Sequence, residues 1–584
     1  MKLSRADFEE LARTGYVFAG KTLGELALGG AVAPGAKLAG ATLFEVDLAG
    51  ADLTGVDLTG ARILGGSLRG ATLDGALASG LDALGCDLTD AKLGGASLVK
   101  SRLALAILTR ADLTGAVIEE SAWPRARLDG AVLTSASLKK VALHGADLRG
   151  ARLDGATLEH VAFEGAECGG ADFRRAVLAN VSFLAARVAG ADFREGSFDT
   201  VTFAKADLRG ARLPKEMRRV VLVGADLDAS ELADKDLSAS ELEGLDLGGA
   251  DLSGAHLDQC VLTGANLRGA NLAGADLTAA VLVQADLRGA NLKDAKLARC
   301  MMLEANLEDA DLSAKELEST MLLRANLTRA SLAGARLERS MLDKANLTDA
   351  DLSRVAVKQG SFSSAILAGA KLDRARFEST NFAGATFGRR VFSGMSFVRC
   401  GFRGSDFAGV RFSRCDFTMA DFSQAKLAGA VFEACTLAQA TLEGADLEGA
   451  SLVDVAAKGA FFGGANLAAA NLTGAKLRYA TLSGAKLAGA RFTGADLRES
   501  LFVKARATKA AFVGAKLGYA DLSHAELVGA DFTSADLSSA NLHGARTDGA
   551  DFTHANTSGT KRDDPERLAA EAWRPPPRPA ARGA

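Results

Sequence analysis

The sequence predicts an all-β solenoid, in which the chain winds into stacked square coils of short parallel strands with a short helix near each end. Two periods predict it: Leu or Phe recurs every five residues with Ala two positions earlier, and other residues recur every 20, as at Val141, Val161, Val181 and Val201. The chain also has 64 glycines and only 6% aromatic residues. This composition favours a core of small aliphatic side chains in a chain with many turns.

The five-residue unit, seen in Ala51-Asp52-Leu53-Thr54-Gly55, cannot form an α-helix. Five residues advance by about 140° beyond one helical turn, so successive Leu side chains would scatter around the surface. An extended segment instead points Ala and Leu to one face and the residue between them to the other. The last two positions, rich in Gly and small polar residues, then turn a corner.

The 20-residue period predicts four such units in each coil, which makes the coil a square. One unit buries only an Ala and a Leu, so it must stack on copies of itself, and residues 20 apart become neighbours. The units occupy residues 16–213 and 222–557. Coils stacked at about 4.8 Å would give a rod on the order of 130 Å long.

These tandem A-(D/N)-L-x-G units resemble the pentapeptide repeat family over most of the chain. The segments Ala265-Asn266-Leu267-Arg268-Gly269 and Ala445-Asp446-Leu447-Glu448-Gly449 carry the resemblance most fully. The resemblance implies a right-handed quadrilateral parallel β-helix, which agrees with the square coil inferred from the period.

Short helices are expected at both ends. In residues 1–15, Ser4 reads as the cap of a helix over residues 5–14, which would cover the open edge of the first coil. In residues 558–584, Asp564-Pro565 opens a second helical stretch to about Trp573. The last residues, RPPPRPAARGA, are too rich in Pro to fold.

The register slips at residues 214–221. Leu213 and Leu222 are nine residues apart instead of ten, and Pro214 cannot donate to a ladder. We therefore expect a bend or a small loop there, separating the repeat segments 16–213 and 222–557.

Phenylalanines and cysteines fall mainly on interior positions. Phe382, Phe402 and Phe422 form one predicted column, and Phe392, Phe412 and Phe432 form another. The seven cysteines show no CxxC spacing, which indicates reduced, interior thiols. Cys415 and Cys435 share a column on neighbouring coils, where a disulfide is conceivable.

The sequence carries no recognisable constellation for catalysis or for a cofactor. Of six histidines, only His524 and His543 fall on the same side of adjacent coils, without an obvious Cys or carboxylate to complete a metal set, so we interpret them as an accident of the surface. The Asp and Asn residues before each Leu face outward, where they can accept backbone hydrogen bonds. We predict a protein that is not an enzyme, with no catalytic, metal or cofactor site.

The net charge of −4 gives no general attraction to nucleic acid or to anionic membranes. No segment approaches the length of about 18 apolar residues that a membrane span requires, and the start of the chain has no apolar stretch behind its basic residues. We expect a cytoplasmic location, no membrane span and no direct binding of nucleic acid.

Methionines recur every 20 residues in CMML, TMLL and SMLD, within residues 300–343. In CMML, Cys300 and Met302 are predicted to point inward, and Met301 and Leu303 outward. The outward residues on this side form the predicted apolar stripe: Val261, Val281, Val283, Met301, Leu303, Met321, Leu323 and Met341. A contiguous apolar patch favours a protein interface, although a covering loop or tolerated variation would also explain it.

A second surface feature is the acidic segment. It contains Asp226, Asp228, Glu231, Asp234, Asp236, Glu241, Glu243, Asp246 and Asp251, against Lys235 alone. We interpret this segment either as an ordinary solvated face or as a docking site for a basic partner.

Two functions compete on this basis. The first is a non-catalytic scaffold or adaptor for protein partners or for self-association into a homodimer. The start, LSRADFEELARTG, and the length of the chain resemble long pentapeptide proteins of bacterial type VI secretion loci, which implies a secretion-apparatus or effector partner.

The alternative is a DNA mimic, because some pentapeptide proteins bind and protect type II topoisomerases such as gyrase in this way. A 130 Å duplex carries on the order of 76 charges at about one per 1.7 Å. The net charge of −4 is far too small for global mimicry, which leaves only a local version at the acidic segment.

Overall fold

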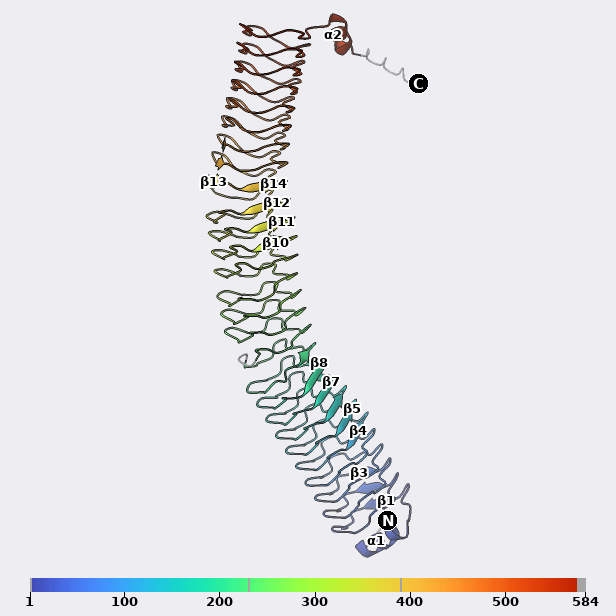
Figure 1. The fold of residues 1–584 in the computed structure, drawn as a ribbon. Helices are drawn as coiled ribbons and strands as arrows, with labels where there is room; N and C mark the ends of the chain where they lie inside the picture. Colours follow the sequence, from blue (N-terminus) through green and yellow to red (C-terminus); the bar gives the residue numbers. More distant parts are fainter. Residues whose placement is uncertain (1–2, 229–231, 389–390, 575–584) are drawn as a thin grey trace, which may run out of the picture. The chain divides into compact units, whose positions relative to one another are not determined.

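The computed structural model describes residues 3–228, 232–388 and 391–574. The chain forms two compact units, Met1–Ala305 and Asn306–Ala584. Each unit is a stack of parallel coils with very short strands, as Figure 1 shows. The predicted all-β solenoid with two short helices is therefore confirmed.

A coil around Leu53 illustrates why the five-residue unit folds as it does. Ala51 and Leu53 are buried, and Asp52 between them faces outward and pairs in parallel with Thr72 on the next coil. The N–H of Val56 donates to Leu53 O at 3.0 Å and closes the corner. Gly55 in this corner has φ +67°, a left-handed conformation that glycine adopts without steric cost.

Unit 1 contains one helix and two ladders of named strands. The helix is α1 (Arg5–Arg13). The first sheet has the order β1 (Thr22–Gly24), β2 (Thr42–Phe44), β3 (Arg62–Leu64). The second has the order β4 (Val117–Glu119), β5 (Ser137–Lys139), β6 (Thr157–Glu159), β7 (Val177–Ser182), β8 (Ser197–Thr202), β9 (Met217–Arg218).

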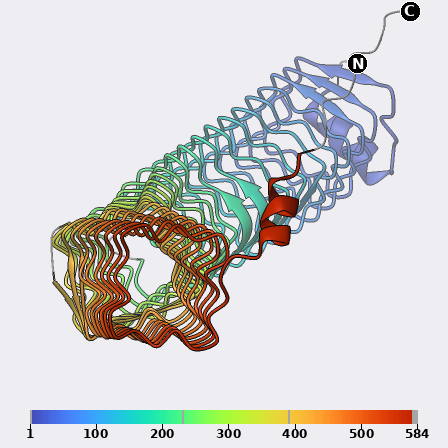
Figure 2. The same cartoon turned by 90° about the horizontal axis from the view of Figure 1, so that it is seen from above.

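Unit 2 also contains two ladders and ends with a helix, α2 (Pro565–Ala572). One sheet has the order β10 (Arg336–Glu338), β11 (Ala356–Lys358), β12 (Arg376–Glu378), β14 (Ser396–Val398). The other has the order β13 (Val391–Ser393), β15 (Arg411–Ser413), β16 (Val431–Glu433). Figure 2 looks along this stack and shows that successive coils superpose.

Helix α1 is fixed by its cap and its apolar side. The Ser4 Oγ accepts a hydrogen bond from Asp7 N at 3.2 Å, and the Asp7 carboxylate accepts one from Ser4 N at 2.9 Å, which completes a capping box. Phe8 is fully buried, with its ring 5.7 Å from that of Phe18. The helix therefore covers the apolar edge of the first coil, as the sequence predicts.

Helix α2 is capped by Asp564, whose carboxylate accepts hydrogen bonds from Glu566 N and Arg567 N. The stretch that we expected to be too Pro-rich to fold begins at Arg574. Its residues beyond Arg574 lie outside the described residues. Neither α1 nor α2, the helices of the described residues, has the length and apolarity needed to cross a membrane.

The register slip is absorbed by a coil of 19 residues instead of 20. Strand β9 pairs with β8 through Phe198 with Met217 and Asp199 with Arg218. The ladder therefore continues through this segment, and Pro214 is left outside it, as its missing N–H requires. The segment 214–221, where we expected a boundary, lies within unit 1.

The core consists of the predicted columns. The ring of Phe412 stacks between Phe392 and Phe432, with centroids at 5.1 and 5.0 Å. All seven cysteines are buried and free, including Cys415 and Cys435. Cys300 and Met302 are fully buried, which confirms the predicted inward direction of these side chains.

Candidate functional site

Five of the eight side chains of the predicted apolar stripe lie in two parallel columns in unit 1. Val261, Val281 and Met301 form one column, in which each residue pairs with the next across adjacent coils. Val283 and Leu303 lie two residues further along each coil, and the N–H of Gln284 donates to Leu303 O at 2.8 Å. The structure therefore brings these five predicted residues together on one side of unit 1.

These side chains are accessible to a partner. Met301 is 37% exposed, whereas the valines and Leu303 are partly buried by their neighbours. At the adjoining corner, the Gln284 amide donates to the Glu304 carboxylate at 2.9 Å. An apolar centre with a polar border is the usual composition of a protein interface.

Two acidic residues continue the same columns. Glu241 pairs directly with Val261, and Glu243 lies two residues further along its coil. Both side chains are exposed, and neither makes an ion pair or a hydrogen bond with the described residues. We call the surface formed by these residues the Met301 face; it consists of Glu241, Glu243, Val261, Val281, Val283, Met301 and Leu303.

The remaining residues of the predicted stripe belong to unit 2. Met321 pairs with Met341 on the next coil, and both are exposed. Leu323 is partly buried and lies two residues after Met321. Within unit 2 these three residues form a smaller apolar surface of the same kind.

The acidic segment does not form one patch, because its residues lie on different sides of the coil. Asp226 pairs with Asp207, Asp236 with Glu216 and His256, and Glu241 with Val221 and Val261. Asp246 follows Asp226 by one 20-residue coil, pairs with Asn266 on the next coil, and accepts a hydrogen bond at Oδ1 from the Asn266 amide at 2.7 Å. Asp228 accepts a hydrogen bond from Gly210 N, and Asp234 is exposed at a corner. Glu231 lies outside the described residues.

Two members of the acidic segment are already paired with arginines. Asp236 is only 9% exposed, and its Oδ2 lies 2.5 Å from Arg218 Nε. Burial raises the pKa of Asp236, but hydrogen bonds from Ser238 and Arg218 outweigh burial and hold the pKa below its usual value. Asp226 lies 3.2 Å from Arg209 Nε. A partner would therefore meet less negative charge here than the sequence indicates.

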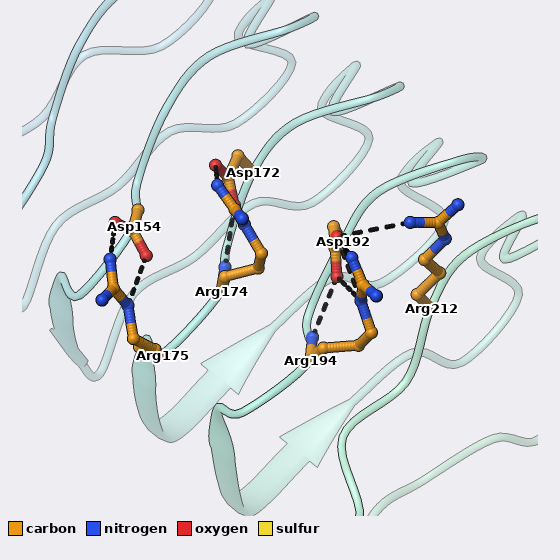
Figure 3. Close-up of polar contacts among 7 residues, drawn as sticks. All are labelled: Asp154, Asp172, Arg174, Arg175, Asp192, Arg194 and Arg212. Carbon is orange, nitrogen blue, oxygen red and sulfur yellow. Dashed lines mark hydrogen bonds and ion pairs between the residues drawn. The ribbon is translucent and has the colours of Figure 1, made fainter.

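On another side of unit 1, the charges of acidic side chains are also neutralised by neighbouring arginines. Figure 3 shows that Asp172 pairs with Arg174, Asp192 with Arg194 and Asp154 with Arg175. Hydrogen bonds from Arg174 hold the pKa of Asp172 below its usual value, so this carboxylate stays ionised and paired. The Met301 face differs from this surface because its carboxylates lack such arginine partners.

Four of the buried thiols are poor candidates for nucleophiles. Burial raises the pKa of Cys86, Cys260, Cys300 and Cys400 to about 12. The thiolate is the reactive form of cysteine, so these side chains remain protonated and inert at neutral pH. Their role is to fill the core.

The sequence did not reveal one cluster of polar side chains. We interpreted His524 and His543 as surface residues that lie close together by chance, but the structure places them in this cluster. His543 is buried, and both histidines lie beside Glu571 of α2. The carboxylate comes from a helix 28 residues beyond His543 in the chain, so the coil period gives no signal for it. The pair is therefore part of a three-residue cluster in unit 2.

Comparisons with solved structures find proteins that match part of this chain, two of them pentapeptide repeat proteins. HetL, a pentapeptide repeat protein involved in heterocyst differentiation regulation from the cyanobacterium Nostoc sp. strain PCC 7120, is 25% identical, and the match covers 42% of this chain and 89% of HetL at a TM-score of 0.20. QnrB1, a plasmid-mediated fluoroquinolone resistance protein, is 20% identical over 44% of this chain and 96% of QnrB1, at 0.16. TM-scores this low do not identify a shared function.

Rfr23, a pentapeptide repeat protein from the cyanobacterium Cyanothece 51142, is 21% identical over 26% of this chain and 85% of Rfr23, at a TM-score of 0.11. No curated protein matches the chain.

Family models cover most of the sequence. The model described as pentapeptide repeats matches residues 27–75, 86–194, 221–313, 322–355, 361–389 and 465–553. A second model, described as a pentapeptide repeat region, matches residues 395–472. Together with the square coils and their five-residue units, these matches show that the chain belongs to the pentapeptide repeat family.

Proposed function

We propose that this protein is a non-catalytic scaffold that binds a protein partner through the Met301 face. The observation that carries the proposal is the pair of apolar columns, bordered on the same columns by Glu241 and Glu243. Methionine suits such a surface because its flexible, polarizable side chain adapts to different partners. We infer that the partner presents an apolar centre with Lys or Arg toward the two glutamates.

The smaller surface of Met321, Leu323 and Met341 offers a second contact of the same chemistry in unit 2. We propose that it engages a protein as well. The N-terminal sequence around α1 resembles pentapeptide proteins of type VI secretion loci, which favours a component of a secretion apparatus or an effector as the partner. A second copy of the chain, giving a homodimer, is the alternative occupant.

Protection of a topoisomerase by DNA mimicry has less support. Mimicry requires a continuous line of unpaired negative charge, whereas Asp226, Asp236 and Glu241 lie on different ladders and two of them pair with arginines. Among the described residues of the acidic segment, Asp234, Glu241 and Glu243 have unpaired carboxylates that would serve it. The variant Glu241→Gln/Glu243→Gln would remove topoisomerase protection if mimicry were the function.

Affinity capture from the native host tests the scaffold. The tagged wild-type chain is compared with Met301→Glu/Leu303→Glu, which places charge in the apolar centre. We expect the specific partner to be lost, because an uncompensated charge buried in an interface costs several kcal/mol. Bound proteins are quantified by mass spectrometry.

The matched control is Val117→Glu. Val117 is as exposed as Met301, at 37%, and likewise stands one residue before a central residue. Circular dichroism confirms that each variant folds. Equal recovery of every partner by the Met301→Glu/Leu303→Glu variant and the wild type would refute the Met301 face as the binding surface.

A further inference from the structure

The end of unit 2 holds three side chains whose donor atoms converge. His524 Nε2 lies 3.1 Å from Glu571 Oε2, and His543 Nε2 lies 3.4 Å from the same oxygen. One donor atom from each residue lies within 4.8 Å of the other two. From this geometry we propose that His524, His543 and Glu571 bind a divalent transition metal ion of the zinc class, which ties α2 to the last coils.

The donor set and its spacing fit zinc. Two imidazoles and a carboxylate are ligands that Zn²⁺ accepts, with bonds of about 2.0–2.2 Å. In a tetrahedron with such bonds the ligand atoms stand about 3.3 Å apart, close to both distances measured to Glu571 Oε2. Three protein ligands leave the fourth position to water.

His543 provides an independent observation. Its side chain is only 3% exposed, and its Nε2 has no hydrogen-bond partner among the residues that the structure describes. The nearby Glu571 oxygen is close enough but is not placed for a hydrogen bond. A buried polar atom without a partner costs free energy unless something else satisfies it, and a metal ion that takes the place of the Nε2 proton would do so.

The neighbouring groups hold the other two ligands in position. The Arg567 Nε donates to Glu571 Oε1 at 2.8 Å, which orients the carboxylate and leaves Oε2 toward the histidines. The His524 ring lies against Gly544, where an added Cβ would stand 2.4 Å from Nδ1. The two imidazole rings are 5.5 Å apart and nearly perpendicular.

The hydrogen bond that His543 Nδ1 accepts determines which ring nitrogen carries the proton. Asp564 N donates to His543 Nδ1 at 3.2 Å, so in the metal-free chain the ring proton is on Nε2. A metal at Nε2 requires that this proton move to Nδ1, which breaks the contact with Asp564.

The test uses the full chain after treatment with a chelator. Zinc chloride is titrated in against a chromophoric zinc indicator, and cobalt(II) is added separately to record its visible absorption. We expect one zinc per chain at this site, and a loss of affinity of at least about tenfold in Glu571→Gln and in His524→Asn. Both changes are at partly exposed positions, and Asn tolerates the left-handed backbone of His524, at φ +57°.

Two matched controls separate the site from other surface groups. His554 occupies a corner with φ +59°, like His524, and Glu566 lies in the same helix as Glu571. His554→Asn and Glu566→Gln are expected to bind zinc as the wild type does. No saturable zinc binding by the wild type, or equal affinity in wild type, Glu571→Gln and His524→Asn, would overturn the proposal and leave α2 held without a metal.

Discussion

At the scale of the residue, the outward Asp and Asn side chains organise the corners of the coils. Asp207 accepts hydrogen bonds from Arg209 N at 3.2 Å and from Arg209 Nε at 2.9 Å. Hydrogen bonds from Arg209 lower the pKa of Asp207 to about 2, against the opposing effect of burial. The same arrangement recurs at Asp192 with Arg194. These carboxylates are structural, which agrees with their predicted role.

The lowered pKa of Asp207 predicts how its contribution to stability depends on pH. A carboxyl group whose pKa is lower in the folded chain stabilises the fold fully above its ordinary pKa of 3.8, and this contribution is lost as the pH falls toward about 2. We therefore expect the difference in melting temperature between wild type and Asp207→Asn to be largest near neutral pH and to shrink as the pH falls from 3.8 through about 2. Thermal denaturation followed by circular dichroism across this range measures it.

A difference in melting temperature that stays constant down to about pH 2 would contradict this account of Asp207, because Asn cannot titrate. Asp→Asn keeps the acceptor for Arg209 N, so the comparison isolates the charge.

At the scale of the element, the strands, corners and core could be predicted because a five-residue period fixes which side chain points inward. The distribution of the acidic segment could also have been read from that period, since Asp226, Asp236 and Glu241 are separated by multiples of five and not of 20. The contact of Glu571 with His543 could not be predicted from the period, because it depends on how a helix outside the repeat folds back.

The phenylalanine columns make a prediction at this scale. Phe412 is buried between two stacked rings, so Phe412→Ala leaves a cavity that neighbouring coils cannot fill. We expect it to lower the free energy of unfolding by about 3–5 kcal/mol. Urea denaturation measures the change.

The matched control for this column is Phe461→Ala, because Phe461 is 49% exposed on an outward position of the same unit. It is expected to change stability by less than about 0.5 kcal/mol. Equal effects of the two substitutions would contradict the view that the inward column carries the stability.

At the scale of the whole molecule, a nearly balanced charge of 68 basic against 72 acidic residues is spread over the coils. The repeat specifies almost every inward and corner position, so only the outward positions are free to determine a partner. This is why family membership could be predicted from the sequence while the function rests on a few side chains. On the Met301 face, outward apolar residues and two unpaired carboxylates replace the paired charges seen at Asp172 and Asp192.

Site-specific photo-crosslinking tests this central claim most directly. A photoreactive amino acid replaces Met301 in one variant and Val117 in another, and both are expressed in the native host. We expect a covalent adduct with a second protein, or with a second copy of the chain, from position 301 and none from position 117. No adduct from position 301, or equal adducts from both positions, would contradict the assignment of the Met301 face as a binding surface.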